Sequence, residues 1–590
     1  GLGDVYKRQV MSKNILKNKR SCVFILLFVL GTSVWLGGCD TAYKYDITDG
    51  IDNNGASEPD ITIDTEGGID VSMYEKARIF PGLVDTAKEE RINATIELDL
   101  NKQYIDSITL GVSKVPQPIY STGLYAGAGE QVAITVEDNT MGLSVIVGSH
   151  MDDLTELAPY QRMPLVYVAK ALFPGKNIIK NPLGGPIWIK KSLGLKASGT
   201  CSLKIEGVYK SPDFVIGETD LQDWKRRISE TTVPWLEIRG KHFAFTVQKD
   251  RVLDNLESIS STLQEVGKEW DEAIEEFFFE YYGLKIDKDA EEKERAPEFP
   301  FRVVLDVQVL GNLYLRNSDY AIVAINNTYM LEEMLNLRTL RIGNSVALLS
   351  AINSMCTYRS RNNPWPADYR TVANAIPLYR IGKKNFSKEN AFGEIFPGEE
   401  NITTLFPKAI EYAMADSSKW AKEDAATKYD DKTAYKAFDL LSLIQLANYD
   451  DNNWEAMKYL NLKAKEERSI DNSTLSYAFR MLCDYFKQNL CPFFDYWGVE
   501  QLDEDRKYAE QYPLMDKKIW EYNPLNPQQL KDYDVSSYCY RHSRRDWKVS
   551  AYDKGYGINY DGDSRKPEYL IDGEKKTNWS SGKILSLIHI

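Results

Sequence analysis

The hydrophobic pattern of this chain changes its period near Val252, and this change restricts the folds that it can adopt. Before that point, short segments alternate apolar and polar residues or form brief apolar runs between Gly and Pro clusters. The clearest are 94–100, 131–136, 143–147 and 186–190. They predict successive strands in β-sandwich layers. After that point, apolar residues from Leu256 to Tyr281 recur at steps of three and four, which predicts a helix with one buried face. We therefore expect an α+β multidomain protein, with N-terminal β-sandwich layers and a mixed α/β to mainly helical body.

Histidine is scarce, because the 590 residues contain four: His150, His242, His542 and His589. No two of them are close enough in sequence to share successive turns of one helix. A peptidase that holds zinc on a helix needs such a pair of imidazoles, a carboxylate ligand and a glutamate that deprotonates the metal-bound water. The histidine positions therefore argue against zinc-dependent hydrolysis of this kind.

The N-terminal region carries the pattern of a lipoprotein signal. Basic residues after Met11 precede the apolar stretch 22–35, and Leu36-Gly37-Gly38-Cys39 then matches the lipobox of bacterial lipoproteins. About 14 apolar residues are too few to span roughly 30 Å of hydrocarbon. We expect a signal peptide over 11–38, lipidation of Cys39, and a lipid-anchored location in the cell envelope, surface-exposed on the outer membrane.

The composition argues against one class of partner, and the cysteine positions argue against a set of disulfide bonds. The formal charge is −14 and no basic stripe is present, which argues against binding to nucleic acid. After Cys39 the cysteines are Cys201, Cys356, Cys483, Cys491 and Cys539. Their irregular spacing is not a disulfide framework, and buried thiols are the simpler interpretation. A pair between Cys483 and Cys491 remains the alternative.

A series of short motifs points to a known family. In chain order they are 79–84 (IFPGLV), 122–126 (TGLYA), 183–187 (LGGPI), 233–237 (VPWLE), 306–309 (DVQV) and 491–498 (CPFFDYWG). Together, over 79–498, they resemble the M60-like (enhancin-type, mucin-degrading) metallopeptidases. The resemblance implies a gluzincin-like peptidase body, a zinc cofactor and glycoprotein substrates.

The same resemblance locates the zinc site and shows where this sequence departs from the family. Active members carry H-E-x-G-H on a helix, and the register from Gly343 places Val346 and Ser350 at the two histidine positions and Ala347 at the general base. Thr371 stands where the third ligand, a glutamate, would be. The sequence therefore predicts no catalytic residue, no bound metal, and a packing helix over 343–354.

Candidate glycan-binding residues lie in the aromatic-rich loop that borders this degenerate site. Tyr358, Arg359, Arg361 and Trp365 are the candidates for contact with an anionic glycan. Packing in the interior is the alternative for Trp365. The neighbouring pair Glu332–Glu333 is expected on a helix surface, with no catalytic role.

The C-terminal part resembles the opening of another module. Trp547, Tyr569–Gly573, Thr577 and Trp579 resemble the start of an F5/8 type C (discoidin-like) domain, a β-sandwich that often binds sugars. The expected divisions are 1–10 (adapter-like read-through), 11–38 (signal peptide), 39–70 (flexible acidic stalk), 71–118 (N-terminal β region), 119–500 (peptidase region, with strands to about 250), 501–536 (linker), 537–584 (truncated discoidin-like domain) and 585–590 (adapter-like read-through).

Three functions are compatible with these observations. The first is a catalytically inactive surface lipoprotein that binds host or dietary glycoprotein and mucin glycans. The second is an active zinc metallopeptidase acting on O-glycosylated mucin-type proteins, as the resemblance alone implies. The third is a structural subunit of a glycan-uptake complex. The absence of a histidine pair favours the first.

Overall fold

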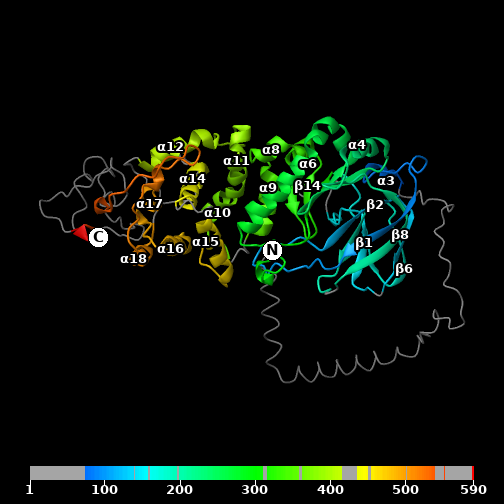
Figure 1. Ribbon diagram of the computed structural model, residues 1–590, viewed down its shortest axis with the longest axis horizontal. Coiled ribbons are helices and arrows are strands. Elements are labelled where there is room, and N and C mark those ends of the chain that lie inside the picture. The colour runs from blue at the N-terminus through cyan, green and yellow to red at the C-terminus, as the bar shows by residue number, and fades with distance from the viewer. Residues whose placement is uncertain are drawn as a thin grey trace, which may run out of the picture. The chain divides into compact units, whose positions relative to one another are not determined.

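The computed structural model (Figure 1) describes most of the chain from residue 74 onward. The described residues are 74–138, 140–156, 160–195, 198–309, 315–357, 362–414, 435–449, 454–499 and 501–538, with the short segments 550–551 and 588–589. They belong to one compact unit, Thr65–Ile590. Cys39, the expected stalk and nearly all of the expected discoidin-like fragment lie outside the described residues, so those expectations remain predictions.

The N-terminal part forms an eight-stranded sheet. Its strands are β1 (Ile92–Asp99), β2 (Ile119–Ala126), β3 (Gln131–Val136), β4 (Leu143–Val147), β5 (Val168–Leu172), β6 (Gly175–Lys180), β7 (Gly185–Lys191) and β8 (Thr200–Lys210). The order is β5-β4-β7-β2-β8-β3-β6, and β1 pairs with β8. Alternate residues of both halves, such as Ile134 in β3 and Val145 in β4, share one buried apolar cluster. The β-rich N-terminal region is therefore confirmed.

Two expected boundaries need correction. Strand β1 pairs along its whole length with β8, so 71–118 is not a region separate from the strands that follow. Residues 501–538 are not a linker either. Trp520 is buried and stacks on Tyr496 with ring centroids 3.9 Å apart, so this segment packs against the helical body. Polar residues predominate in this segment of the sequence, so the contact was not predicted.

The second sheet has six strands. They are β9 (Phe214–Val215), β10 (Trp235–Arg239), β11 (Phe243–Gln248), β12 (Phe301–Asp306), β13 (Leu315–Asn317) and β14 (Ile322–Ile325). The order is β13-β14-β12-β11-β10-β9, with β11, β12 and β14 parallel and β13 antiparallel at one edge. The predicted amphipathic helix is present as α6 (Leu256–Ala273), continued by the π-helix η2 (Ile274–Glu280). Its buried residues Leu263 and Trp270 pack in the main core.

The remaining structure is mainly helical, as the sequence predicts. The helices are α3 (Tyr74–Ile79), α4 (Leu221–Glu230), α5 (Lys249–Leu253), α7 (Thr328–Leu335), α8 (Leu337–Arg341), α9 (Val346–Cys356), α10 (Ala367–Asn374), α11 (Ile376–Glu389), α12 (Ile402–Met414), α14 (Lys436–Ala447), α15 (Glu455–Glu466), α16 (Ser476–Phe486), α17 (Cys491–Tyr496) and α18 (Asp503–Ala509). Short 3-10 turns are η3 (Glu292–Glu294), η6 (Ile519–Glu521) and η7 (Val535–Ser537), and β15 (Ser550–Ala551) pairs with β16 (Ile588–His589). None of the described helices is long and apolar enough to cross a membrane.

Apolar packing and two buried ion pairs lie where the two large sheets meet. Trp188 of β7 packs with Val304 and Val323 of the second sheet. Arg162 meets the carboxylate of Asp306 in β12 through two nitrogens, with Nη2–Oδ2 at 2.7 Å, and both side chains are fully buried. Because the paired charges lie on segments far apart in sequence, they fix how the two sheets meet.

The second ion pair joins two strands of the six-stranded sheet and meets the first sheet through Trp188. Arg302 of β12 donates to Glu237 Oε1 of β10 at 2.7 Å, and its guanidinium lies over the Trp188 ring, 4.4 Å from the centroid. The Trp188 indole nitrogen donates to the same carboxylate oxygen at 3.1 Å.

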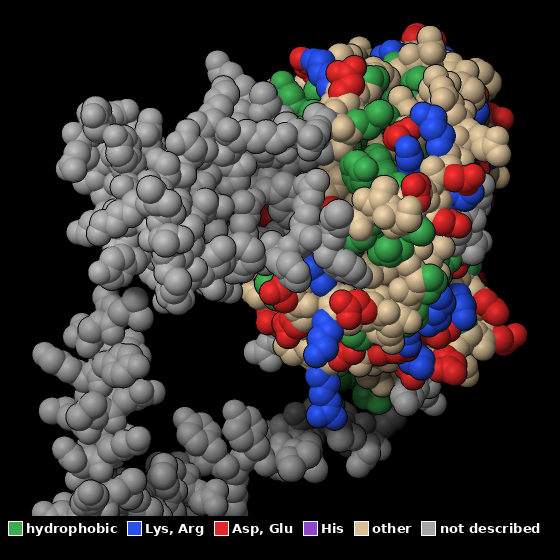
Figure 2. Space-filling model, turned by 90° about the vertical axis from the view of Figure 1, so that its left-hand side faces the viewer, with side chains coloured by type: hydrophobic (Ala, Val, Ile, Leu, Met, Phe, Trp, Pro, Cys, Tyr) green, Lys and Arg blue, Asp and Glu red, His purple; other side chains and the backbone are tan. Residues whose placement is uncertain are grey.

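Charged side chains on the surface are arranged differently from those in the interior. On the face in Figure 2, acidic and basic side chains are interspersed and do not form patches of one sign.

Candidate functional site

Helix α9 is the helix that the sequence predicts at the degenerate zinc site. It begins at Val346, three residues later than expected, because Gly343 adopts φ +75° and ends the preceding turn. A Cβ at Gly343 would lie 2.5 Å from the carbonyl oxygen of Leu378, so the close approach of α11 requires glycine there. The predicted packing role is confirmed, since Leu348, Leu349 and Ile352 are fully buried.

Helices α9 and α10 meet through a chain of buried hydrogen bonds. Tyr282 Oη donates to Asn353 Oδ1 at 2.7 Å, and Asn353 Nδ2 donates to Asn374 Oδ1 at 3.1 Å. Asn353 lies one turn beyond Ser350 in α9, and Asn374 one turn beyond Thr371 in α10. The fold therefore brings together the two segments that carry the zinc ligands in the resembling peptidases.

The side chains at the four positions that the sequence predicts to be degenerate do not fit a zinc ion. Val346 and Ala347 are half-buried and pack against the core, Ser350 is half-buried, and Thr371 is exposed. None of them offers the imidazole or carboxylate donors that a protein zinc site uses. Across the described part of the chain, no group of three or more His, Cys, Asp and Glu side chains is arranged to hold a metal ion.

A buried carboxylate occupies the N-terminal end of α9. Glu333 of α7 accepts the backbone N–H of Leu348 at 2.9 Å and that of Ala347 at 3.3 Å. Ser345 holds the N-cap position, but its hydroxyl donates to the Glu333 carbonyl, so the Glu333 side chain serves as the cap. The expectation of a surface pair is thus wrong for Glu333, which is 1% exposed. Burial raises the pKa of Glu333, although the amides and Tyr329 oppose the rise.

Of the four glycan-binding candidates, Trp365 is the one that the structure describes. Tyr358, Arg359 and Arg361 lie outside the described residues. Trp365 is 4% exposed and stacks on Tyr369, with centroids 6.4 Å apart. It lines a cavity of about 10 Å³, enough for about one water molecule. The structure therefore gives Trp365 the packing role and leaves no open ring face for a sugar.

The two histidines whose side chains the structure describes, His150 and His242, are structural. His150 is buried, with Nε2 2.8 Å from the Leu305 carbonyl oxygen and edge contacts to the Phe80 and Trp235 rings. His242 Nε2 lies 2.7 Å from Glu275 Oε1. Burial lowers the pKa of both imidazoles. His150 is thus hydrogen-bonded through both ring nitrogens, to Ser149 and Leu305, and His242 through Nε2 to Glu275.

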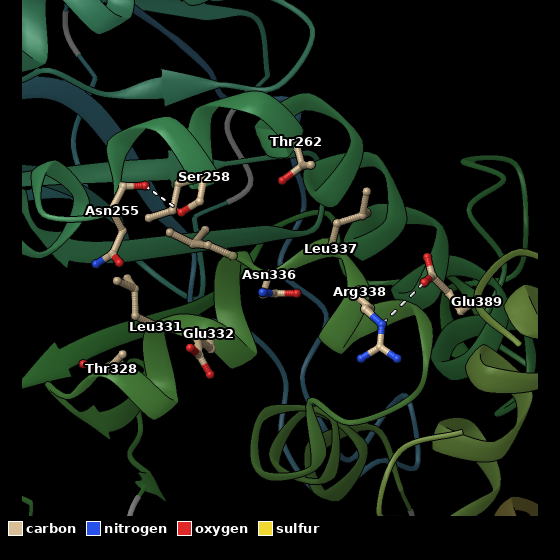
Figure 3. Close-up of a pocket in the computed structure, with 12 residues that line it drawn as sticks. Asn255, Ser258, Thr262, Thr328, Leu331, Glu332, Asn336, Leu337, Arg338 and Glu389 are labelled. Atoms are coloured by element: carbon tan, nitrogen blue, oxygen red, sulfur yellow. Dashed lines mark hydrogen bonds and ion pairs between the residues drawn. The ribbon is translucent and has the colours of Figure 1, made fainter. Parts of the chain in front are cut away.

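Two larger cavities were not predicted from the sequence. One, of about 300 Å³, lies between α6 and α7–α8 over the apolar side chains of Leu331 and Leu335 (Figure 3). At its edge Arg338 points toward Glu389, 3.8 Å away. The other, of about 460 Å³, lies where the two large sheets meet the C-terminal end of α9. Both depend on contacts between distant segments, for which no short sequence pattern exists.

Comparison with known families agrees with this arrangement. Residues 90–205 match the N-terminal domain of M60-like peptidases, and residues 207–341 match peptidase M60, enhancin and enhancin-like. Residues 90–341 are therefore similar to M60-like peptidases. The first match covers the eight-stranded sheet, and the second covers the six-stranded sheet and helices α6 to α8. The resemblance is thereby confirmed for the motifs within 90–341, whereas the motifs 79–84 and 491–498 lie outside the two matches.

Curated relatives of this chain include the TRPM8 channel-associated factors. Factor 2 of Homo sapiens is 27% identical over 195 residues, which cover 32% of this chain and 19% of that protein. Factor 3 of Mus musculus is 24% identical over 424 residues, or 69% of this chain and 40% of that protein. The chain therefore spans well under half of the length of these relatives.

Solved structures share the fold at low sequence identity. A functionally unknown conserved protein from Bacillus anthracis is 19% identical with a TM-score of 0.54, over 75% of this chain and 84% of that one. The M60 catalytic domain of Clostridium perfringens ZmpC, in complex with the sialyl T antigen, is 16% identical with a TM-score of 0.53, over 78% and 86%. These likenesses extend the shared fold beyond residue 341 into the helical body.

Proposed function

We propose that this protein is a non-catalytic M60-like lipoprotein of the cell surface that binds glycoprotein, and that it recognises mucin-type glycans without cleaving the chain. The proposal rests on the side chains of α9 and α10 at the expected positions of the zinc ligands and the general base. Val346, Ala347, Ser350 and Thr371 supply no zinc ligand and no base. With the peptidase fold kept and its chemistry lost, recognition is the activity that remains.

Recognition of a glycoprotein does not depend on the zinc ligands. Sugars are bound by stacking and hydrogen-bonding groups around a site, and such groups persist when the metal-binding residues are replaced. The ZmpC domain that shares this fold was solved with the sialyl T antigen bound. This supports a mucin-type glycan as the ligand class for the present chain.

The purified protein is expected to contain no stoichiometric zinc and to leave mucin-type glycoproteins uncut. Metal analysis by mass spectrometry and electrophoresis of a mucin after prolonged incubation check this. An active M60 zinc peptidase treated in parallel is the positive control. About one zinc per chain together with EDTA-sensitive cleavage would show that this protein is an enzyme after all.

The full chain is expected to bind O-glycosylated mucin on a glycan array and in a pull-down. Enzymatically deglycosylated mucin is the matched control, and binding to it should be lost. Equal binding to both forms would instead favour the second candidate, a docking subunit that contacts protein. The names of the relatives, which describe association with a channel, favour that candidate.

Membrane attachment is expected to depend on Cys39. In a Gram-negative host, Cys39→Ala should move the protein from the membrane fraction to the soluble fraction, because no acyl chain is attached. Cys22→Ala is the matched control, since Cys22 lies within the apolar stretch and should leave lipidation intact. Membrane retention of the Cys39 variant would contradict the lipoprotein assignment.

A further inference from the structure

The larger cavity joins both family domains to the end of the degenerate zinc helix. Its volume is about 460 Å³, within the range of small-molecule sites. Lys190 of β7 lines it from the first sheet, Phe301 and Arg302 from the start of β12, and Met355 from the C-terminal end of α9. The site therefore exists only when all three parts are assembled.

The segment before β2 closes the cavity and is fixed to α9. The backbone N–H of Ser113 donates to the Thr357 carbonyl at 2.8 Å, and that of Lys114 donates to the Met355 carbonyl at 3.0 Å. These carbonyls at the helix end would otherwise lack partners. The side chains of Ser113 and Lys114 are consequently held at the cavity wall by backbone bonds.

The lining carries an excess of positive charge within an acidic protein. Lys190 forms no ion pair with any described residue. Lys114 Nζ lies 3.4 Å from both the Ser318 carbonyl oxygen and the carboxylate of Asp319, whose side chain is fully exposed. Arg302 is already paired with Glu237 at 2.7 Å. An unpaired, half-buried ammonium favours a ligand that brings an anion.

The rest of the lining suits a polyol. Tyr104, Ser107, Ser113 and Gln117 offer hydroxyl and amide groups, and Phe301 and Pro116 offer apolar surface. Few well-placed polar groups over an apolar wall are typical of sites for small ligands. The cavity of Figure 3 lacks this character, because its cation, Arg338, already faces Glu389.

We propose that this cavity binds an acidic sugar, with the carboxylate or sulfate of the ligand on Lys190 and Lys114 and its hydroxyls on the polar lining. This proposal rests on the proposed function and deepens it, because it gives the glycan-binding protein a site and a ligand class. Ammonium-to-oxyanion hydrogen bonds supply the affinity, and the polyol contacts distinguish a sugar from a free anion.

Titration calorimetry of the full chain tests the site with defined probes. These are N-acetylneuraminic acid and glucuronic acid as carboxylates, 6-sulfo-N-acetylglucosamine as the sulfate, and neutral N-acetylglucosamine and inorganic phosphate as comparisons. Binding of an acidic sugar is expected, with affinity at least about tenfold weaker in Lys190→Met. Lys190→Arg keeps the charge and should retain part of the binding. Lys180→Met, on the exposed end of β6, is the matched control and should bind like the wild type.

The possible results distinguish a failure of this site from a failure of the proposed function. Absence of binding by every acidic sugar, equal binding by Lys190→Met, or equal binding of the neutral sugar or phosphate overturns the site. If the Lys190→Met variant still binds mucin as the wild type does, the site fails and the glycoprotein-binding function stands. If wild type binds an acidic sugar but no mucin, the function fails and the cavity remains a site. Matching thermal midpoints of the variants exclude unfolding as the cause of any loss.

Discussion

Replacing Asp306 by Ala is expected to lower the free energy of unfolding by about 3–5 kcal/mol. The substitution leaves the guanidinium of Arg162, which is fully buried, without its bidentate carboxylate partner. A buried charge without a partner cannot recover its lost hydration. The loss also loosens the contact between the two sheets, since Arg162 lies outside β12 and reaches it across the interface. Urea unfolding followed by tryptophan fluorescence measures the change.

Two variants show whether burial causes this effect. Asp532→Ala breaks an ion pair with Lys517 at the surface, where Asp532 is 87% exposed, and should cost at most about 1 kcal/mol. Arg162→Met combined with Asp306→Leu removes both charges and should recover much of the lost stability. If Asp306→Ala unfolds at the same urea concentration as Asp532→Ala, the buried pair does not join the sheets as argued.

Asp306 also shows which part of the structure the sequence could predict. Its segment, 306–309, is one of the motifs that resemble the family in the sequence. Its partner could not be found, because Arg162 lies 144 positions earlier in an irregular segment. Local period predicted the strands and the helix α6 correctly, since neighbouring residues determine which face of an element is buried. Contacts between segments that are distant in sequence produce no periodic pattern of apolar residues.

The same limit explains the errors at the candidate site. The helix was found, because its apolar face follows from a register within one segment, and the assignment of Val346 and Ser350 to the histidine positions remains a prediction. The role of the Trp365 ring stayed open in the sequence. Around its cavity lie Tyr281, Tyr282 and Asn461, which come from segments distant in sequence. Lys190 attracted no attention in the sequence, since a lysine near the end of a strand is most often surface. Only the assembled sheets show that it faces a cavity.

Glu333 gives the second large effect. Glu333→Ala is expected to lower the free energy of unfolding by about 2–3 kcal/mol, because the N–H groups of Ala347 and Leu348 lose their acceptor at a helix end. Leu348 is fully buried, so water cannot replace the carboxylate there. Glu332→Ala, at the neighbouring and exposed position, is the matched control and should change stability by less than about 0.5 kcal/mol. Equal effects of the two substitutions would remove Glu333 as the cap of α9.

The pH dependence of Glu333→Gln tests the charge separately from the hydrogen bonds. Glutamine keeps an acceptor oxygen but cannot titrate. Burial raises the pKa of Glu333 above its ordinary 4.5, so the folded state holds the proton more tightly than the unfolded state. The stability from that proton is fully present below pH 4.5 and is lost as the pH rises through the raised pKa of the folded state. The wild type should therefore lose stability relative to Glu333→Gln as the pH rises from 4.5 toward neutrality, measured by urea unfolding at each pH. A constant difference across that range would show that the carboxyl of Glu333 does not titrate differently in the folded and unfolded protein.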